Sequence, residues 1–457
     1  MTGRLALAIV ETLAVVAATA LASASSPEAR QPSGQAWKTA WAASGHGPYP
    51  SGNATAQPVL DFAFGPAATG ASDQTFRMIV RPDIWGPQAR IRFTNAFGTM
   101  PITFDDAYVG LQSSGAAVVA GTTQRLTFGG GQPAVTVRPG ETIFSDAAAL
   151  PFVTTGPAAL LEGRKLAISF HVGDTTGPMT WHAKALTTSY VGGPKTGRHG
   201  ADASDAAFPN SMTSWFFVDA VDMMAPADTA VVVAFGDSIT DGTASTINGD
   251  DRWPDVLSRR LHATPGLRAS VVNAGIGGNQ IIGPPEYSAA APFSGGPSAL
   301  GRLERDVLSL SGVTTVVWLE GINDISAGAS AEAIVTGLKD GVVRLRARGI
   351  RVVGATITSA LGYAGASGTP EADVRRRAIN DFIRTPGSFD AVADFDLATA
   401  DPATGALRAA FQPNSSTGGA GDKLHPNRAG YLAMGSAVDL ASLLPGRPAA
   451  GRAPSAR

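Results

Sequence analysis

Short runs of alternating apolar and polar residues fill the first half of the chain. The clearest run has apolar residues at every second position from Leu166 to Val172, and similar runs occur at 76–81 and 90–93. Each run lies between clusters of Gly, Pro, Asp or Asn. Repeated short strands separated by turns are typical of an antiparallel β-sandwich or jelly roll. We expect this domain to span residues 36–226, with its last strand at 215–218 and a linker at 225–228.

The pattern changes at residue 229, where a continuous apolar run, residues 230–235, predicts a strand that is buried on both faces. Further strands are expected at 270–272, 313–319, 350–357 and 391–395. Apolar residues at helical spacing predict helices between them, at 253–261, 303–310, 331–348 and 375–383. Alternating strands and helices indicate a parallel sheet with helices on both faces. We expect this α/β domain to span residues 227–446.

The two ends of the chain have a different character. Arg4 is followed by a mostly apolar stretch, residues 5–21, and by the small residues of Ala22-Ser23-Ala24. This order is typical of a cleaved export signal, so we expect a signal peptide at 1–24 and a secreted or periplasmic protein. A retained membrane anchor is the alternative, and the charge of Glu11 argues against a stable span. Residues 25–35 are expected to be a flexible leader, and residues 447–457 a disordered tail.

Composition narrows the chemistry. The 457 residues include no cysteine, which excludes disulfides, thiolate nucleophiles and cysteine-ligated zinc. A formal net charge of -2 gives no electrostatic reason to expect nucleic acid or an anionic membrane as partner. A Gly-x-Gly-x-x-Gly nucleotide motif fails after Gly275 and Gly277, because Gln280 occupies its last position. The residues indicate no metal site and no cofactor.

Polar residues that can support catalysis follow the predicted strands of the second half. Ser238 follows the first strand, Gly278 the second and Asn323 the third, while Asp422 and His425 come after the last. Ligands of an open parallel sheet bind beyond the carboxyl ends of its strands, so these residues should meet at one edge.

This set can fill every role in nucleophilic catalysis. Serine needs a base to take its proton, histidine suits that task near neutral pH, and a carboxylate must orient the imidazole. Ser238, His425 and Asp422 could take these roles, and the Gly278 N–H and the Asn323 amide could stabilise the oxyanion. Structural alternatives remain open. Ser238 and Asp422 are good helix N-caps, His425 could be a loop residue and Asn323 a turn residue. The aspartates Asp237 and Asp324 are expected to hold their loops by local hydrogen bonds.

Four blocks in this half resemble the SGNH, or GDSL, hydrolase family. They are Gly-Asp-Ser-Ile-Thr-Asp-Gly, Asn-Ala-Gly-Ile-Gly-Gly-Asn, Gly-Ile-Asn-Asp and Asp-Lys-Leu-His-Pro, in the family's order. The resemblance implies a flavodoxin-like three-layer α/β fold and a Ser238–His425–Asp422 triad. It also implies an oxyanion hole made by the Ser238 N–H, the Gly278 N–H and the Asn323 amide. The spacing from Asn273 favours Gly278 over its neighbours Gly275 and Gly277.

The first half resembles the all-β domain that precedes the catalytic domain in some exported bacterial SGNH proteins. Residues 37–41, 92–98 and 177–182 carry this likeness. Within it, Trp181 and His182 could indicate a carbohydrate-stacking surface, although a buried aromatic beside a hydrogen-bonded histidine is the favoured interpretation.

Together these features predict an exported serine esterase that forms an acyl-serine intermediate. We expect short-acyl, acetyl-like esters of carbohydrates as substrates, either small molecules or glycans, and neither nucleic acid nor stable membrane insertion. The alternatives are a lipase or lysophospholipase, an acyltransferase that uses the same intermediate, and a glycan-binding module without catalysis.

Overall fold

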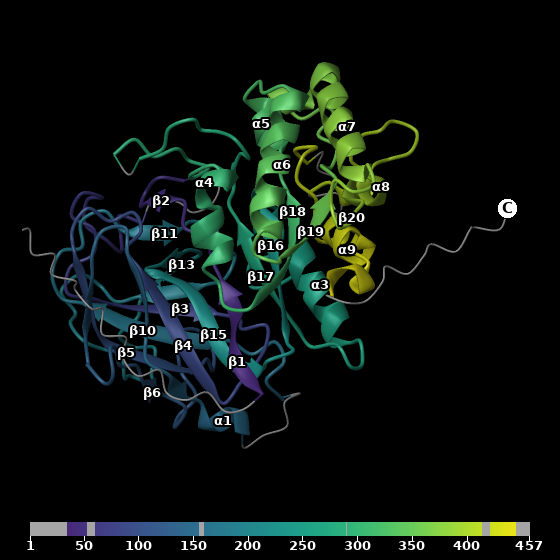
Figure 1. Ribbon diagram of the computed structural model, residues 1–457. Helices are drawn as coiled ribbons and strands as arrows, with labels where there is room; N and C mark the ends of the chain where they lie inside the picture. Colours follow the sequence, from purple (N-terminus) through teal and green to yellow (C-terminus); the bar gives the residue numbers. More distant parts are fainter. Residues whose placement is uncertain (1–33, 53–59, 155–159, 289, 414–420, 445–457) are drawn as a thin grey trace, which may run out of the picture. The chain divides into compact units, whose positions relative to one another are not determined.

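The computed structural model describes residues 34–52, 60–154, 160–288, 290–413 and 421–444 (Figure 1). The expected signal peptide, almost all of the expected leader and the expected tail lie outside these residues. None of the described helices is long and apolar enough to cross a membrane.

The first half consists of antiparallel strands, as the alternating pattern predicts. Its elements are β1 (Gln35–Ala42), β2 (Gly47–Pro48), β3 (Gln74–Val80), β4 (Gln88–Thr94), β5 (Ile102–Leu111), β6 (Gln124–Arg125), β7 (Val135–Val137), β8 (Thr142–Phe144), β9 (Ala148–Ala149), α1 (Pro151–Thr154), β10 (Leu166–Val172), β11 (Thr180–His182), β12 (Ser189–Val191), β13 (Asn210–Met212), β14 (Trp215–Phe216) and β15 (Val218–Pro226).

Two large sheets form this half. One has the order β1-β15-β4-β8, with β9 also paired to β4, and the other has the order β13-β12-β3-β10-β5-β6, with β7 paired to β5. A small third sheet has the order β14-β11-β2. Phe76, Phe93, Phe170 and Val221 come from both large sheets and lie in one buried cluster. Two antiparallel sheets around a shared core form a β-sandwich.

The expected last strand and linker of this half are wrong. The last strand is β15, which runs on through residues 225 and 226 and pairs with β1 along its length, while β14 is a separate two-residue strand. The sequence obscures β15 because two aspartates interrupt its apolar residues. Asp219 is 2.6 Å from Arg92, and Asp222 is 2.9 Å from Arg90. Carboxylates paired across strands in this way can be buried in a strand that lacks simple alternation. Only residues 227–229 connect β15 to the second half. At the other end of this half, β1 begins at Gln35, a residue that was expected to belong to the leader.

The second half alternates strands and helices. Its elements are β16 (Ala230–Gly236), α2 (Ser238–Asp241), α3 (Trp253–His262), β17 (Ala269–Gly275), α4 (Ala299–Leu303), a π-helical turn (Glu304–Leu308), β18 (Val313–Leu319), α5 (Ile322–Ser326), α6 (Ala331–Arg346), β19 (Arg351–Ala355), α7 (Pro370–Arg384), β20 (Ala391–Ala393), α8 (Phe395–Thr399) and α9 (Arg428–Ala437). The helix expected at 303–310 begins earlier, because Ser298 caps α4, and it continues as the π-helical turn.

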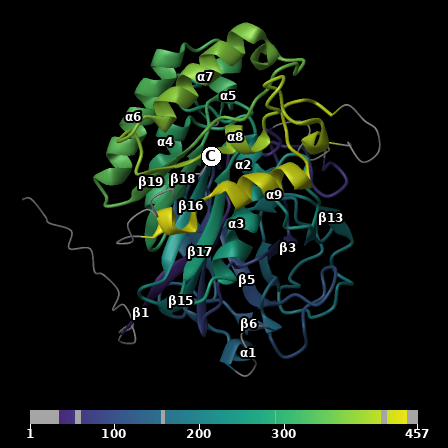
Figure 2. The same ribbon diagram turned by 90° about the vertical axis from the view of Figure 1, so that its right-hand side faces the viewer.

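These five strands form one parallel sheet in the order β17-β16-β18-β19-β20. Numbered along the chain, this is the flavodoxin-like order 2-1-3-4-5. Helices α3 and α9 cover one face, and α4, α6 and α7 cover the other (Figures 1 and 2). The expected three-layer α/β fold is therefore confirmed, and the carboxyl ends of β16, β17 and β18 lie side by side.

Direct hydrogen bonds connect the two halves. The Ser270 hydroxyl donates to the Thr39 carbonyl at 2.7 Å, and the Arg92 guanidinium donates to the Ser309 hydroxyl at 2.8 Å. Arg305 donates to the Gly45 carbonyl at 2.6 Å. The described residues between 34 and 444 accordingly belong to one compact unit. The β-rich half is thus a fixed neighbour of the parallel sheet.

Candidate active site

Ser238 is the first residue of the short helix α2, directly beyond the carboxyl end of β16. Asp237 is the N-cap of this helix, and its carboxylate accepts the Ile239 N–H at 2.9 Å. Gly242 ends the helix in the left-handed region, at φ 108°. Because Asp237 caps the helix, the Ser238 hydroxyl does not serve as its cap. Asp237 thereby has the loop-holding role expected from the sequence.

His425 and Asp422 complete a chain of hydrogen bonds from this serine. The Ser238 Oγ lies 2.9 Å from the His425 Nε2, and the His425 Nδ1 lies 2.5 Å from the Asp422 Oδ2. The other Asp422 oxygen accepts the backbone N–H groups of Leu424 and His425, at 3.0 and 2.9 Å. The N-cap of α9 is Asn427, so Asp422 does not cap that helix.

These contacts also set the charge of Asp422. Partial burial would raise the pKa of this carboxyl, but the hydrogen bonds and charge of His425 outweigh burial and lower the pKa to about 2. Asp422 is therefore an anion throughout the neutral range, as a residue that orients an imidazolium must be.

The loop after β17 presents three candidate N–H donors, and two of them are already used. The Gly275 N–H donates to the Asn273 side chain at 2.9 Å, and the Gly277 N–H donates to the Asp241 Oδ2 at 3.0 Å. Within the described part of the chain, the Gly278 N–H has no hydrogen-bond acceptor. Gly278 also has a φ of +82°, a conformation that favours glycine. Of the three glycines, Gly278 alone keeps its N–H available for a ligand.

Asn323 lies in α5, just beyond the carboxyl end of β18. One N–H of its amide donates to the Asn279 carbonyl at 2.9 Å, which ties it to the Gly278 loop and leaves its second amide hydrogen for another acceptor. The neighbouring Asp324 accepts the N–H groups of Ile281 and Ile282 at 2.8 and 3.0 Å. Asp324 thus holds the same loop, in agreement with the role expected for it.

Arg302 is a structural residue of this edge that the sequence did not single out. Its buried guanidinium donates to the Gly236 carbonyl at 2.9 Å, the Ala274 carbonyl at 2.8 Å and the Asn279 side chain at 2.7 Å. It therefore joins the ends of β16 and β17 to the loop beyond. The available signal was an arginine on the otherwise apolar face of α4.

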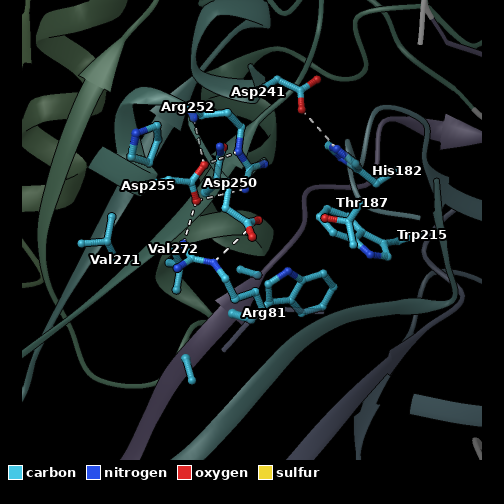
Figure 3. Close-up of a pocket in the computed structure, with 15 residues that line it drawn as sticks. Arg81, His182, Thr187, Trp215, Asp241, Asp250, Arg252, Asp255, Val271 and Val272 are labelled. Carbon is cyan, nitrogen blue, oxygen red and sulfur yellow. Dashed lines mark hydrogen bonds and ion pairs between the residues drawn. The ribbon is translucent and has the colours of Figure 1, made fainter. Parts of the chain in front are cut away.

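Two side chains of the β-rich half also reach this edge, and the sequence did not place them there. The His182 Nε2 lies 3.2 Å from the Asp241 Oδ1 (Figure 3), and the Lys184 Nζ lies 2.5 Å from the Thr243 hydroxyl. Trp181 is 4% exposed, so it offers no open stacking surface. The favoured interpretation of this pair, a buried aromatic beside a hydrogen-bonded histidine, is confirmed.

The arrangement suits attack by a serine on an acyl carbon. A hydroxyl lies against an imidazole that is held by a carboxylate, and two donors remain free nearby. In the described ranges, no group of three or more histidine and carboxylate side chains is placed to hold a metal ion.

Comparisons with known proteins show which family and which solved structures this half resembles. The sequence model of the GDSL-like Lipase/Acylhydrolase family matches residues 234–433. Similar solved structures include a G-D-S-L family protein from Desulfitobacterium hafniense, with 18% identity, a TM-score of 0.34 and coverage of 46% of this chain and 97% of that one. A lipase/acylhydrolase from Enterococcus faecalis has 22% identity, a TM-score of 0.34 and coverage of 46% and 92%. An acetyl xylan esterase from Geobacillus stearothermophilus has 19% identity, a TM-score of 0.32 and the same coverage. No curated protein matches the chain.

Proposed function

Because residues 234–433 belong to the GDSL-like lipase/acylhydrolase family, whose members hydrolyse esters, we propose that Ser238 is the nucleophile of this enzyme. The observation that carries the proposal is the hydrogen-bond chain from the Ser238 Oγ through both nitrogens of His425 to Asp422. Both contacts are within the range at which a proton can transfer or an imidazole can be oriented.

In the proposed reaction, His425 takes the Ser238 proton as the Oγ attacks the ester carbonyl carbon. The tetrahedral intermediate collapses when the imidazolium gives that proton to the departing alcohol, which leaves an acyl-serine. His425 then takes a proton from water, the resulting hydroxide attacks the acyl carbon, and the carboxylic acid leaves as Ser238 regains its proton. Asp422, an anion at neutral pH, stabilises the imidazolium in both steps.

We assign the oxyanion to three donors, which are the Ser238 N–H, the Gly278 N–H and the second amide hydrogen of Asn323. The first is at the start of α2, where helical N–H groups have no partner within the helix. The other two are the donors that the surrounding loops leave free. Each such donor is worth about 3 kcal/mol in the transition state.

For the substrate, we propose short-acyl, acetyl-like esters of carbohydrates that the enzyme meets after export. The expected signal sequence supports export, and polar groups close to the serine support a small acyl group. A Cβ built on Gly277 would lie 4.0 Å from the Ser238 Cβ, 3.6 Å from the Lys184 Nζ and 3.5 Å from the Asp241 Oδ2. A long acyl chain needs apolar surface to bury its methylenes. Around Gly277, beside Ser238, the structure has the charged groups of Lys184 and Asp241 instead.

The test is ester turnover by the wild type and by Ser238→Ala, with acetate release and p-nitrophenyl esters as substrates. Ser388→Ala is the matched control, since Ser388 precedes β20 at the opposite edge of the sheet. We expect the first variant to lose at least 10³-fold in kcat and the second to keep full activity. Full turnover by Ser238→Ala would refute the assignment.

A series of acyl lengths, followed by product analysis with an acceptor sugar present, tests the substrate. A preference for acetyl over octanoyl and longer esters is expected. The reverse preference would favour a lipase, and transfer of the acyl group to the sugar would favour an acyltransferase. Glycan binding without turnover of any ester would favour a binding module.

A further inference from the structure

Asp241 is a buried carboxylate that connects the two halves of the molecule beside the proposed active site. Its Oδ2 accepts the Gly277 N–H at 3.0 Å, and its Oδ1 lies 3.2 Å from the His182 Nε2. Figure 3 shows the two side chains turned toward each other from separate parts of the chain. His182 ends β11 in the β-rich half, whereas Gly277 belongs to the proposed oxyanion loop. Asp241 thus links His182 of the β-rich half to the proposed oxyanion loop of the parallel-sheet half.

His182 is held in its doubly protonated form by its surroundings. Its Nδ1 faces the Ser44 carbonyl at 2.8 Å, and its Nε2 faces the Lys184 carbonyl at 3.0 Å as well as Asp241. All three partners are acceptors, so both ring nitrogens must donate. Burial would lower the pKa of His182, but the charge and hydrogen bonding of Asp241 outweigh burial and raise it.

The charge of Asp241 depends on this partner. The Asp241 side chain is 4% exposed, and a buried carboxylate is costly unless it is paired and hydrogen-bonded. Burial would raise its pKa, yet the pKa is lowered, first by His182 and then by Lys184 and Arg252. Two of these three cations, His182 and Lys184, come from the β-rich half. The parallel-sheet half by itself would leave Asp241 with one of them, Arg252.

We propose that His182 is a positioning residue of the active site, so that the β-rich half completes the catalytic machinery. His182 holds Asp241, Asp241 holds the Gly277 N–H, and the peptide that follows carries the Gly278 N–H. Orientation of that donor therefore depends on a residue in the other half. The inference rests on the proposed function of Ser238 and Gly278, and it assigns a catalytic purpose to the packing of the two halves.

The test compares His182→Gln, Asp241→Asn and the double variant in the full chain. The number of reactive sites is counted by titration with an organophosphonate that labels the serine, and kcat and KM are measured per labelled site. We expect either single variant to lower kcat about 10- to 100-fold with KM within about twofold, because a misplaced donor weakens transition-state binding. Asp241→Asn removes the charge that keeps His182 doubly protonated, and it turns a new amide N–H toward a ring nitrogen that also faces the Lys184 carbonyl. In the double variant the glutamine carbonyl can accept that N–H, so partial recovery of kcat is expected.

His171→Gln is the matched control. His171 is a buried histidine of β10 whose Nδ1 lies 2.7 Å from Asp105, so it has a comparable aspartate partner, but no described contact connects it to the loop of Gly277. This variant should keep the wild-type kcat per labelled site. Wild-type kcat in His182→Gln, or an equal loss in His171→Gln, would overturn the proposal. Should His182→Gln fail to fold, Asp241→Asn and the double variant decide, since recovery requires a direct partnership between the two side chains.

The controls separate this inference from the proposed function. If Ser238→Ala is inactive while kcat is unchanged in the His182 and Asp241 variants, the positioning role alone is wrong. If Ser238→Ala remains active, the nucleophile itself is wrongly assigned, whatever the other variants do.

Discussion

Replacement of Asp237 by asparagine should stabilise the protein at alkaline pH and less so at acid pH. Asp237 is 1% exposed, and burial raises its pKa to about 7 from an ordinary value of 3.8. Between these two values the folded protein keeps a proton that the unfolded chain releases, so the stability of the wild type falls as pH rises. From pH 5 to about pH 7 this loss amounts to about 3 kcal/mol, at about 1.4 kcal/mol for each pH unit. Asparagine does not titrate, and its oxygen can still accept the Ile239 N–H.

The measurement is the free energy of unfolding in urea at pH 5 and pH 8 for the wild type and Asp237→Asn. The free energy of unfolding of Asp237→Asn relative to that of the wild type should increase by about 3 kcal/mol from pH 5 to pH 8, since every other titrating group is common to both proteins. Asp340→Asn, an exposed site on α6, controls for the general effect of replacing a carboxylate by an amide. A difference between Asp237→Asn and the wild type that is the same at both pH values would refute the reasoning.

The site gives four further predictions. Asn323→Ala should lower kcat about 10²-fold with little change in KM, because it removes a donor that acts on the oxyanion; steady-state kinetics measures this, and a change confined to KM would contradict it. Asp422→Asn should lower kcat by on the order of 10³- to 10⁴-fold at neutral pH. Because the pKa of Asp422 is lowered to about 2, its carboxylate should remain ionised from pH 7 down to pH 4, and an NMR titration that shows Asp422 taking up a proton within that interval would contradict this. Arg302→Met should lower the free energy of unfolding by about 3 kcal/mol, since it strips a buried hydrogen-bond network of its central cation, and urea denaturation would show whether it does.

The sequence was sufficient for most of the fold because local patterns agree with the final structure. The strand β16, which is buried on both faces, is a continuous apolar run, and a parallel sheet covered by helices requires such strands. Local pattern was not sufficient at β15, where aspartates are buried through ion pairs with β4. Those partners lie more than a hundred positions away in the chain, so no local pattern could show that Asp219 and Asp222 are buried within a strand.

Sequence by itself determined which residues could carry the chemistry, because each side chain of the proposed triad has its own reactivity and follows a recognisable strand. Tertiary structure decided which of them meet. It brought Ser238, His425 and Asp422 into one hydrogen-bond chain, and it favoured Gly278 over Gly275 and Gly277 by occupying the other two N–H groups.

Only the tertiary structure could show that His182 and Lys184 lie beside this site. Their place depends on how the β-rich half packs against the loops of the parallel sheet. A contact between residues far apart in sequence leaves no periodicity in either segment, because the apolar pattern of a segment reflects only its own secondary structure and burial. Local sequence patterns therefore indicate which residues can react in this chain. The contacts that hold those residues in place form only when the two halves pack together.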